Sequence, residues 1–423
     1  MLRRLGLIAL ALLLVAPAAA QAAVNPDSGY GTSGTATVPF SCSDHTYEEA
    51  DALAAYGGRF FVLFDCGGGY LRLEALNSAG QTDSTWGTDG HLVFKAPTSC
   101  IGYQMLVHPT SSGTVFIALE QQAQDGGSHV CLARVLPSGS LDKTYGGTSA
   151  IRLLSHTGGG APNSLFNIDV DSKGRLLAFS QRYDTQGLKG AAFIDRYTVS
   201  GKPDPTFSGD GERAVVVPHQ TFLDYGGVYG TKPIVAVSSL ADGDPLSGSI
   251  ATTFARFSET GALDASFGTG GSKRVTPSQI GGADIQGIES DALGRIVFVA
   301  ISNGQFGGNR WWDVVRLTKS GTIDTAFGAG FAREPIASGQ NVSIATLGLM
   351  TGHYVITWEQ QSSATDKLQS TGISSDGQPW TALGPGGTTD VTGGFAKDRA
   401  AFYGINYLQD PTNEVQITRS LVE

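Results

Sequence analysis

The segment Gly261-Ala-Leu-Asp264-Ala-Ser-Phe267-Gly268-Thr-Gly-Gly271 decides the architecture, because near-copies of it recur along the whole chain. The pattern is a glycine, an aspartate three residues later, an aromatic residue three further on, and then one or two more glycines. Clear copies begin at four other positions: Gly80, Gly139, Gly201 and Gly321. A copy without its first glycine opens at Asp27, and an eroded copy begins at Gly377.

The glycine that follows the aromatic residue gives the period of the repeat. It falls at positions 31, 87, 146, 268, 328 and 384, and Ser208 takes the remaining place. The successive steps are 56, 59, 62, 60, 60 and 56 residues. A nearly fixed period indicates an array of similar units that share a continuous core.

Each repeat contains the signals for about four short strands. Ile296–Ile301 is a continuous run of β-branched and aromatic residues, as expected for a strand covered on both faces. The preceding Asp291-x-x-Gly294 favours a hairpin turn, because glycine tolerates the turn and aspartate bonds back to its own backbone. One strand follows the motif, two flank the hairpin and one precedes the next motif. This pattern predicts the blade of a β-propeller.

The two ends of the chain complete one another. The strand that precedes the motif occurs seven times, and its last copy, residues 414–422, stops where a motif is due. The partial motif at Asp27 supplies the missing piece. We therefore expect an all-β fold, a single seven-bladed β-propeller whose ring is closed by the N-terminal strand joining the last blade. Closure removes exposed sheet edges that invite aggregation. Six or eight blades would require a misassigned motif.

The motifs resemble the delta-60 repeat family, whose units carry a Gly-x-x-Asp-x-x-Phe-Gly-x-x-Gly signature in exported or surface bacterial proteins. The resemblance covers nearly the whole chain after its first residues. Departures are Ser208, Phe331 in place of a glycine, and the eroded copy at 377–387. The resemblance implies an exported, propeller-like repeat protein. It implies no reaction and no catalytic residue, because the family signature is structural.

The first residues have the layout of a secretory signal peptide. Arg3 and Arg4 precede an apolar run from Leu5 to Ala16, and a tract of small residues follows. This run is shorter than the roughly 20 residues of a membrane-spanning helix. We expect a signal peptide at 1–22, with cleavage after residue 20 as the alternative, and a propeller at 23–423. The protein should then be periplasmic, secreted or at the cell surface, with no membrane span.

Charge and composition exclude some functions. Charged residues make up only 16% of the chain and there are 58 glycines, which favours turn-rich β structure. The sequence has 28 basic and 38 acidic residues, and removal of Arg3 and Arg4 would leave 26 against 38, a net charge of −12. Binding to nucleic acid depends on lysine and arginine contacts with phosphates, so we expect no nucleic-acid partner.

The four cysteines all lie in the first third of the chain. In an exported protein an even number indicates disulfides, and four cysteines allow three pairings. Cys42 and Cys100 lie 11 and 13 residues after their motif glycines, and Cys66 and Cys131 come later in the same two repeats. This placement favours Cys42–Cys66 and Cys100–Cys131. Four buried thiols are the alternative, and the spacing does not favour a metal site.

An arginine lies eight residues before the motif aspartate in most repeats. We expect these residues to form buried ion pairs that stabilise the turn of each blade. The pairs are Arg134–Asp142, Arg196–Asp204, Arg256–Asp264, Arg316–Asp324 and, across the ring closure, Arg419–Asp27. The first repeat has Asp83 but Ala75, and the eroded repeat has lost both partners, with Gly372 and Trp380. A repeated metal or ligand site is the alternative for these aspartates.

The sequence contains no established catalytic motif. The serine-hydrolase elbow, the metalloprotease helix motif, the phosphate-binding loop and the dinucleotide fingerprint are all missing. Asp169 and Asp171 lie two apart on an expected strand and so share a face, as a pair of catalytic carboxylates could. Three further groups could bind a partner: the tryptophans 311, 312, 358 and 380, and the polar loops 121–128 and 303–309.

We expect an exported, non-catalytic binding module with a protein or glycan partner. The alternative is a carbohydrate-active enzyme, a glycoside hydrolase or polysaccharide lyase, with its site at a mouth of the central channel. We expect no cofactor and no metal, and a monomer. The catalytic residues of the enzyme alternative are unknown from the sequence.

Overall fold

The computed structural model describes most of the chain between residues 24 and 422. Residues 1–23 and 423 lie outside the described residues, and with them the expected signal peptide. The internal gaps are 40–41, 43–48, 98–99, 101–103, 123–127, 146–150, 154–162, 184–189, 217–220, 241–249, 277–278, 280–283, 303–309, 329–330, 337–340, 351, 362–366, 384–387, 392–393, 399–400 and 409–413.

The described strands form seven separate antiparallel sheets. The first three consist of β3 (Glu49–Tyr56), β4 (Arg59–Asp65), β5 (Tyr70–Leu76) and β6 (His91–Lys95); β7 (Gln104–Pro109), β8 (Val115–Gln122), β9 (Ser128–Val135) and β10 (Ile151–Leu153); and β11 (Asn163–Val170), β12 (Leu176–Tyr183), β13 (Gly190–Tyr197) and β14 (Glu212–Val215).

The next three repeat this order. They consist of β15 (Thr221–Tyr229), β16 (Lys232–Leu240), β17 (Ile250–Arg256) and β18 (Ser272–Val275); β19 (Asp284–Ser290), β20 (Ile296–Ser302), β21 (Arg310–Leu317) and β22 (Phe331–Ile336); and β23 (Asn341–Met350), β24 (His353–Gln361), β25 (Lys367–Ser374) and β26 (Thr388–Val391). The short 3-10 helix η4 (Thr381–Leu383) precedes β26.

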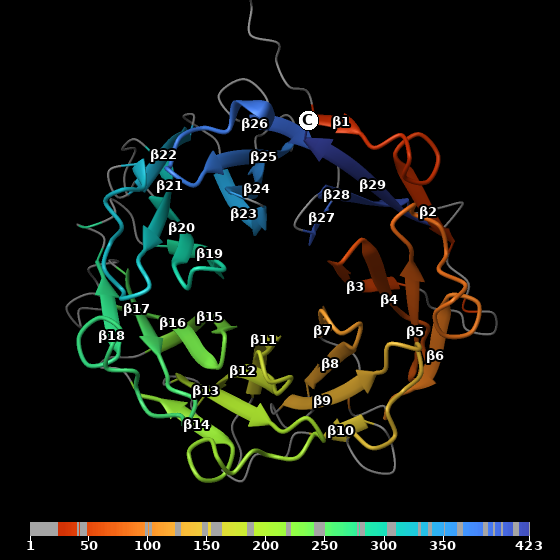
Figure 1. The fold of residues 1–423 in the computed structure, drawn as a ribbon, viewed down its shortest axis with the longest axis horizontal. Coiled ribbons are helices and arrows are strands. Elements are labelled where there is room, and N and C mark those ends of the chain that lie inside the picture. Colours follow the sequence, from red (N-terminus) through yellow and green to blue (C-terminus); the bar gives the residue numbers. More distant parts are fainter. Residues whose placement is uncertain are drawn as a thin grey trace, which may run out of the picture.

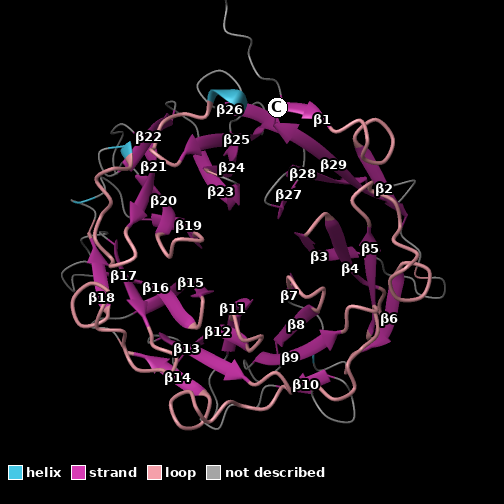
Figure 2. Cartoon of the chain, viewed as in Figure 1, coloured by secondary structure: helices cyan, strands magenta, loops and turns pink. Residues whose placement is uncertain are grey.

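The last sheet combines the two ends of the chain. It contains β27 (Gly394–Asp398), β28 (Ala401–Leu408) and β29 (Glu414–Val422), and β1 (Val24–Pro26) and β2 (Thr35–Pro39) both pair with β29. Viewed down the shortest axis, the sheets lie in a circle, with the first strand of each nearest the centre (Figure 1). Strands and loops make up nearly all of the drawing in Figure 2. The prediction of an all-β, propeller-like fold is confirmed.

Each sheet is displaced by one strand relative to the sequence repeat. The strand that follows a motif pairs with the strand that precedes the same motif, as β14 does with β13. The motif is therefore the turn between the third and fourth strands of one sheet. The hairpin between the first and second strands lies at the same end, because neighbouring strands alternate in direction. Motifs and hairpins consequently share one face of the molecule.

The core lies between successive sheets. One cluster joins Val297, Val299 and Trp312 of the fifth sheet to Leu347 and Ile356 of the sixth, all of them buried. Both faces of the second strand are covered in this way, which explains its continuous apolar run. Within the described part of the chain, none of the helices combines the length and the hydropathy that crossing a bilayer requires.

The motif glycines are required where successive repeats approach each other. Gly139 has a φ of +80°, and a Cβ there would lie 2.1 Å from the backbone nitrogen of Gly87 in the preceding motif. The Gly87 nitrogen donates a hydrogen bond of 2.9 Å to the Ser138 carbonyl oxygen. Ser208 makes the corresponding bond to Thr260 and keeps a φ of +55°, a conformation that favours glycine.

Candidate functional site

The motif arginines connect three parts of the structure. Arg196 Nε lies 2.9 Å from Asp204 Oδ2, and its guanidinium carbon lies 4.6 Å from the centre of the Phe207 ring. Its Nη1 donates to the carbonyl oxygen of Glu259 in the next repeat at 2.6 Å. Each arginine thus joins its own motif to the following sheet. The corresponding Nε–Oδ2 distances are 2.8, 2.9 and 2.8 Å for Arg134–Asp142, Arg256–Asp264 and Arg316–Asp324.

Several motif aspartates have pKa values below the ordinary value of an aspartate: Asp83, Asp142, Asp204 and Asp264. Burial alone would raise the pKa of Asp142, but hydrogen bonds from Thr144 and Arg134 outweigh it and lower the pKa to about 2. Burial is likewise outweighed at Asp204, where hydrogen bonds from Thr206 and the charge of Arg196 lower the pKa. These carboxylates are therefore ionised at neutral pH and occupied by partners within the protein.

A second basic side chain reaches several motif aspartates from the inner hairpin. This basic residue is the first or the second residue after the hairpin glycine. Arg59 Nη2 lies 2.5 Å from Asp83 Oδ2, and Lys232 Nζ lies 2.7 Å from Asp264 Oδ2. Arg59 thereby supplies, in the first repeat, the positive charge that is missing at Ala75.

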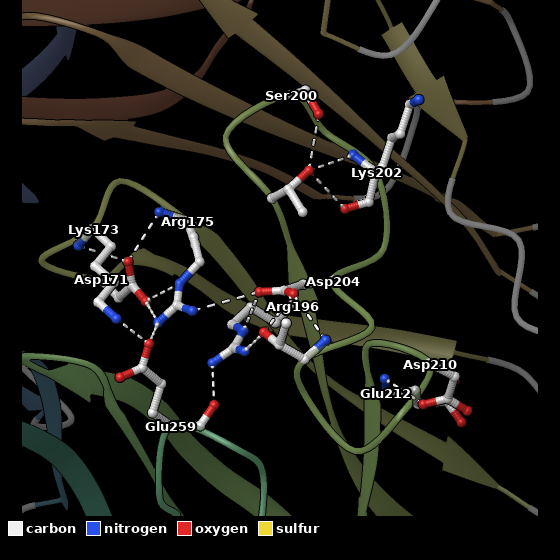
Figure 3. A network of polar contacts seen from close by, with 12 residues as sticks. Asp171, Lys173, Arg175, Arg196, Ser200, Lys202, Asp204, Asp210, Glu212 and Glu259 are labelled. Atoms are coloured by element: carbon white, nitrogen blue, oxygen red, sulfur yellow. Dashed lines mark hydrogen bonds and ion pairs between the residues drawn. The ribbon is translucent and has the colours of Figure 1, made fainter.

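In the third sheet the basic residue at this hairpin position, Arg175, contacts three carboxylates. Arg175 Nε lies 2.7 Å from Asp171 Oδ2, and its Nη atoms lie 3.1 Å from Glu259 and 3.5 Å from Asp204. Lys173 also contacts Glu259. Figure 3 shows Arg175 between these three carboxylates, beside the Arg196–Asp204 pair. Basic side chains fill the space between the hairpin and the motif.

The second sheet has a threonine at this position, and a cavity lies beside it. Thr114 follows the hairpin glycine Gly113, where Arg59 and Arg175 stand in the neighbouring sheets. A cavity of about 520 Å³ is bordered by Thr114, Arg134 and the hairpin of the third sheet. The short threonine side chain leaves open the space that an arginine would occupy.

The lining of this cavity includes a histidine and an aspartate from neighbouring inner strands. His108 Nε2 of β7 lies 3.6 Å from Asp169 Oδ1 of β11, and their side chains are 32% and 23% exposed. Asp169 also accepts hydrogen bonds from the backbone nitrogens of Val170 and Val228, at 2.7 and 2.8 Å. Asp169 therefore links three successive sheets and still faces the cavity.

A second cavity of about 400 Å³ adjoins the first. It lies between the hairpins of the first and second sheets, and Arg59 and Asp83 border it. Both cavities are lined by the same four residues, Tyr56, Pro109, Thr110 and Ser111. We call the two cavities together the hairpin groove. Tyr56, at the end of β3, is 37% exposed.

Both disulfides favoured by the sequence are present, Cys42–Cys66 and Cys100–Cys131. Each joins successive sheets, because the strand after a motif belongs to the preceding sheet. Cys42 follows β2 of the last sheet and Cys66 follows β4 of the first. The described residues include no group of three or more His, Cys, Asp or Glu side chains that could hold a metal ion.

The tryptophans whose side chains are described pack against other aromatic rings. Trp312 is buried and packs against Trp358, with 6.1 Å between ring centres. Trp380 stacks on His353 in the eroded repeat. Alternation on the strand directs Trp312 into the core, so its side chain does not contribute to a sugar-binding face. The side chain of Trp311 lies outside the described residues.

Other predicted positions differ in how far the structure describes them. Asp171 is held by Arg175 and by the backbone nitrogens of its own turn, which gives it a structural role. Asp27 is described, whereas the side chain of Arg419 lies outside the described residues, as do 123–127 and 303–309 of the polar loops. Sequence reasoning missed His108 and Thr114. The hairpin glycine, aligned between repeats, would have marked Thr114 as the exception.

Comparisons with known proteins support a β-propeller repeat. A family model described as "Domain of unknown function (DUF5122) beta-propeller" matches residues 294–327, from the hairpin glycine to the motif aromatic residue of one repeat. No curated protein sequence matches the chain.

Several solved structures are similar at low identity. A puromycin hydrolase is 12% identical with a TM-score of 0.49, over 90% of this chain and 55% of that one. An acylaminoacyl peptidase of Pyrococcus horikoshii is 9% identical with a TM-score of 0.49, over 89% and 52%. A PL25 ulvan lyase is 11% identical with a TM-score of 0.43, over 91% and 96%. The chain spans about half the length of the first two. At these identities the similarity assigns no activity to this chain.

Proposed function

We propose that the chain is an exported β-propeller of the delta-60 type, with seven blades in a closed ring and a signal peptide at 1–22. The pairing of β1 and β2 with β29 supports closure, because it joins both ends of the chain in one sheet. The two disulfides support export, because such bonds persist in oxidising compartments.

The function that the geometry supports best is that of a non-catalytic binding module. The observation that carries this proposal is the hairpin groove, two adjoining cavities on the face formed by motifs and hairpins. Their volumes fall in the range of roughly 300–1,000 Å³ that is typical of ligand sites. The hydroxyl groups of Thr110, Ser111 and Ser112 lie on a hairpin turn, which its sheet holds in place.

The carbohydrate-active enzyme is the second candidate, and the His108–Asp169 pair favours it. A histidine beside a carboxylate is a common general acid or base, and this pair lies at the ends of two inner strands. Two observations favour binding instead. Asp169 already accepts two backbone hydrogen bonds, and Asp171 is paired with Arg175.

The experiment that separates these functions is an array of bacterial and plant polysaccharides incubated with the purified protein. Bound protein and newly released reducing ends are measured on the same spots. Binding without release supports the module. Release of reducing ends contradicts it and establishes the enzyme, with His108 and Asp169 as the first residues to substitute. Silence in both measurements excludes these polysaccharides and leaves a protein partner for the module.

A further inference from the structure

We propose that the hairpin groove binds a neutral oligosaccharide, one molecule per chain, with Tyr56 between two successive sugar subsites. The inference rests on the proposed binding function and names the ligand of that site. It follows from the pairing of the charged residues in the groove, from the groups that remain, and from the reason why the cavity exists at all.

The two arginines that line the groove, Arg59 and Arg134, are each paired with an aspartate. Arg59 is paired with Asp83, and Arg134 is paired with Asp142 and also donates to the carbonyl oxygen of Val199 in the next repeat. The aspartate beside each guanidinium balances its charge, so these two arginines offer no uncompensated positive charge to an incoming carboxylate, sulfate or phosphate. The whole chain also has a net charge of −10, which repels polyanions. The groove therefore favours an uncharged ligand.

The aspartates that pair with these two arginines are committed in the same way. Asp83 and Asp142 each accept hydrogen bonds from an arginine and from a threonine hydroxyl, Thr85 or Thr144. Hydrogen bonds from Thr85 and Arg59 outweigh burial and lower the pKa of Asp83. A cationic ligand would have to compete with these partners, so the balance of charges again favours a neutral one.

The groups that remain suit a ligand rich in hydroxyls. Thr110, Ser111 and Ser112 line the larger cavity, and Ser111 and Ser112 are exposed. The Thr110 and Ser112 hydroxyls are 2.9 Å apart within the turn, which leaves each of them further lone pairs for a ligand. Hydroxyl groups donate and accept hydrogen bonds, as sugar hydroxyls do. Asp169 adds a strong acceptor and His108 a ring nitrogen. Such a lining can satisfy several sugar hydroxyls at once.

Tyr56 gives the groove its apolar element. It borders both cavities and is 37% exposed at the end of β3. An aromatic ring with a polar hydroxyl can contact the apolar face of a sugar and also form a hydrogen bond. Because the two cavities of about 400 and 520 Å³ meet at this residue, the ligand should extend across both. An oligosaccharide fits this division better than a single sugar.

The position of Thr114 explains why one site is expected. In the first, third and fourth sheets the hairpin places Arg59, Arg175 or Lys232 near the motif aspartate. In the second sheet the threonine leaves that space to the groove. An arginine introduced at Thr114 should enter the cavity and approach Asp142, as Arg175 approaches Asp204. It would close the site, and the contact that it removes is the hydrogen bond from the Ser112 hydroxyl to the Thr114 hydroxyl, at 3.2 Å.

The test is isothermal titration calorimetry with neutral oligosaccharides derived from cellulose, xylan and mannan, and with oligogalacturonides of the same lengths. The proteins are the wild type, Thr114→Arg and Tyr56→Ala. Thr231→Arg is the matched control, because it adds the same charge to a hairpin of the fourth sheet. Thermal melts accompany each titration, and we expect Thr114→Arg to melt at or above the wild-type temperature. Tyr56→Ala, at a partly exposed position, keeps the test valid if Thr114→Arg does not fold.

We expect a neutral oligosaccharide to bind at a 1:1 ratio, with at least tenfold weaker affinity in Thr114→Arg and Tyr56→Ala and unchanged affinity in Thr231→Arg. Preference for oligogalacturonides, or neutral binding that both groove variants retain, overturns the inference while the binding function stands. Absence of binding by every oligosaccharide also overturns it. Groove-dependent binding accompanied by release of reducing ends upholds the ligand assignment and contradicts the non-catalytic function.

Discussion

The imidazole of His353 lies stacked on the indole of Trp380, with 3.8 Å between ring centres and 18° between planes. The two residues occupy the positions that hold the hairpin cation and the motif aspartate elsewhere. The eroded repeat has therefore replaced an ion pair by two stacked rings. Gly372 completes the exchange, because a Cβ there would lie 2.8 Å from Trp380 Cε3 and 2.2 Å from Leu383 Cδ1.

This exchange predicts coupling between Gly372 and Trp380. Gly372→Arg alone should destabilise the fold by roughly 1–3 kcal/mol, because the new side chain overlaps the indole. In the background of Trp380→Asp, the arginine gains the partner that Arg316 has in Asp324, and its cost should fall by about 1 kcal/mol or more. Urea unfolding of the four proteins of the cycle measures this. Strictly additive effects would contradict the exchange.

Removal of the motif aspartate Asp264 is predicted to destabilise the fold. Its Oδ2 atom accepts from both Arg256 and Lys232, at 2.9 and 2.7 Å. Asp264→Ala leaves the nearly buried Arg256 without its carboxylate, which typically costs roughly 3–5 kcal/mol. Thermal and urea unfolding against Lys202→Ala, an exposed control, check the value. An unchanged stability would show that the motif pairs do not stabilise the fold.

Asp195 gives a pH dependence of opposite sign to that of the motif aspartates. Burial raises its pKa to about 7; Arg182 opposes the rise, and the charges of Glu212 and Asp210 add to it. Between about pH 4 and 7 the folded carboxyl retains a proton that the unfolded chain has lost, so the stability of the fold decreases as the pH rises. Asp195→Asn should remove this loss.

The measurement is the free energy of unfolding of wild type and Asp195→Asn at pH 4 and pH 8. The free energy of unfolding of the variant minus that of the wild type should be on the order of 1–3 kcal/mol higher at pH 8 than at pH 4. Asp210→Asn, at an exposed position, should show a smaller change. A difference between wild type and Asp195→Asn that is the same at both pH values would refute the assignment.

Both disulfides should contribute to stability because they restrict the unfolded chain. They join residues 24 and 31 positions apart. Loops of this size correspond to roughly 3–4 kcal/mol for each bond in the chain-entropy description. Addition of a strong reductant should therefore lower the melting temperature of the wild type. A variant with all four cysteines replaced by serine should already melt at the lower temperature and show no response.

The period and the character of the strands could be predicted from the sequence because both depend on local chemistry. The glycine at position 261 must adopt a left-handed φ, and the run from Ile296 to Ile301 must be buried on both faces. The arginine eight residues before Asp264 was visible for the same reason, since one turn joins them. These relations lie within a few residues of each other.

The hairpin groove could not be predicted in this way, because it arises from a side chain that is short. Nothing in its own repeat distinguishes Thr114. Its short side chain is unusual only by comparison with Arg59 and Arg175, which follow the hairpin glycine in the neighbouring sheets. The partner of Asp83 was missed for a related reason. Arg59 lies 24 residues away, on a different turn, and only the fold brings the two together. The contact between His108 and Asp169 also crosses between sheets.

The pairing of Val24 with Val422 determines when the last sheet can be completed during folding. β1 and β2 are synthesised before their partner strand β29, and β3 to β28 are made in between. Until then β2 has an unsatisfied edge. The Cys42–Cys66 bond can form long before, and it would keep this segment tethered beside the first sheet while the other sheets assemble. Early formation of this disulfide would thus keep β2 close to its final position until β29 is available to pair with it.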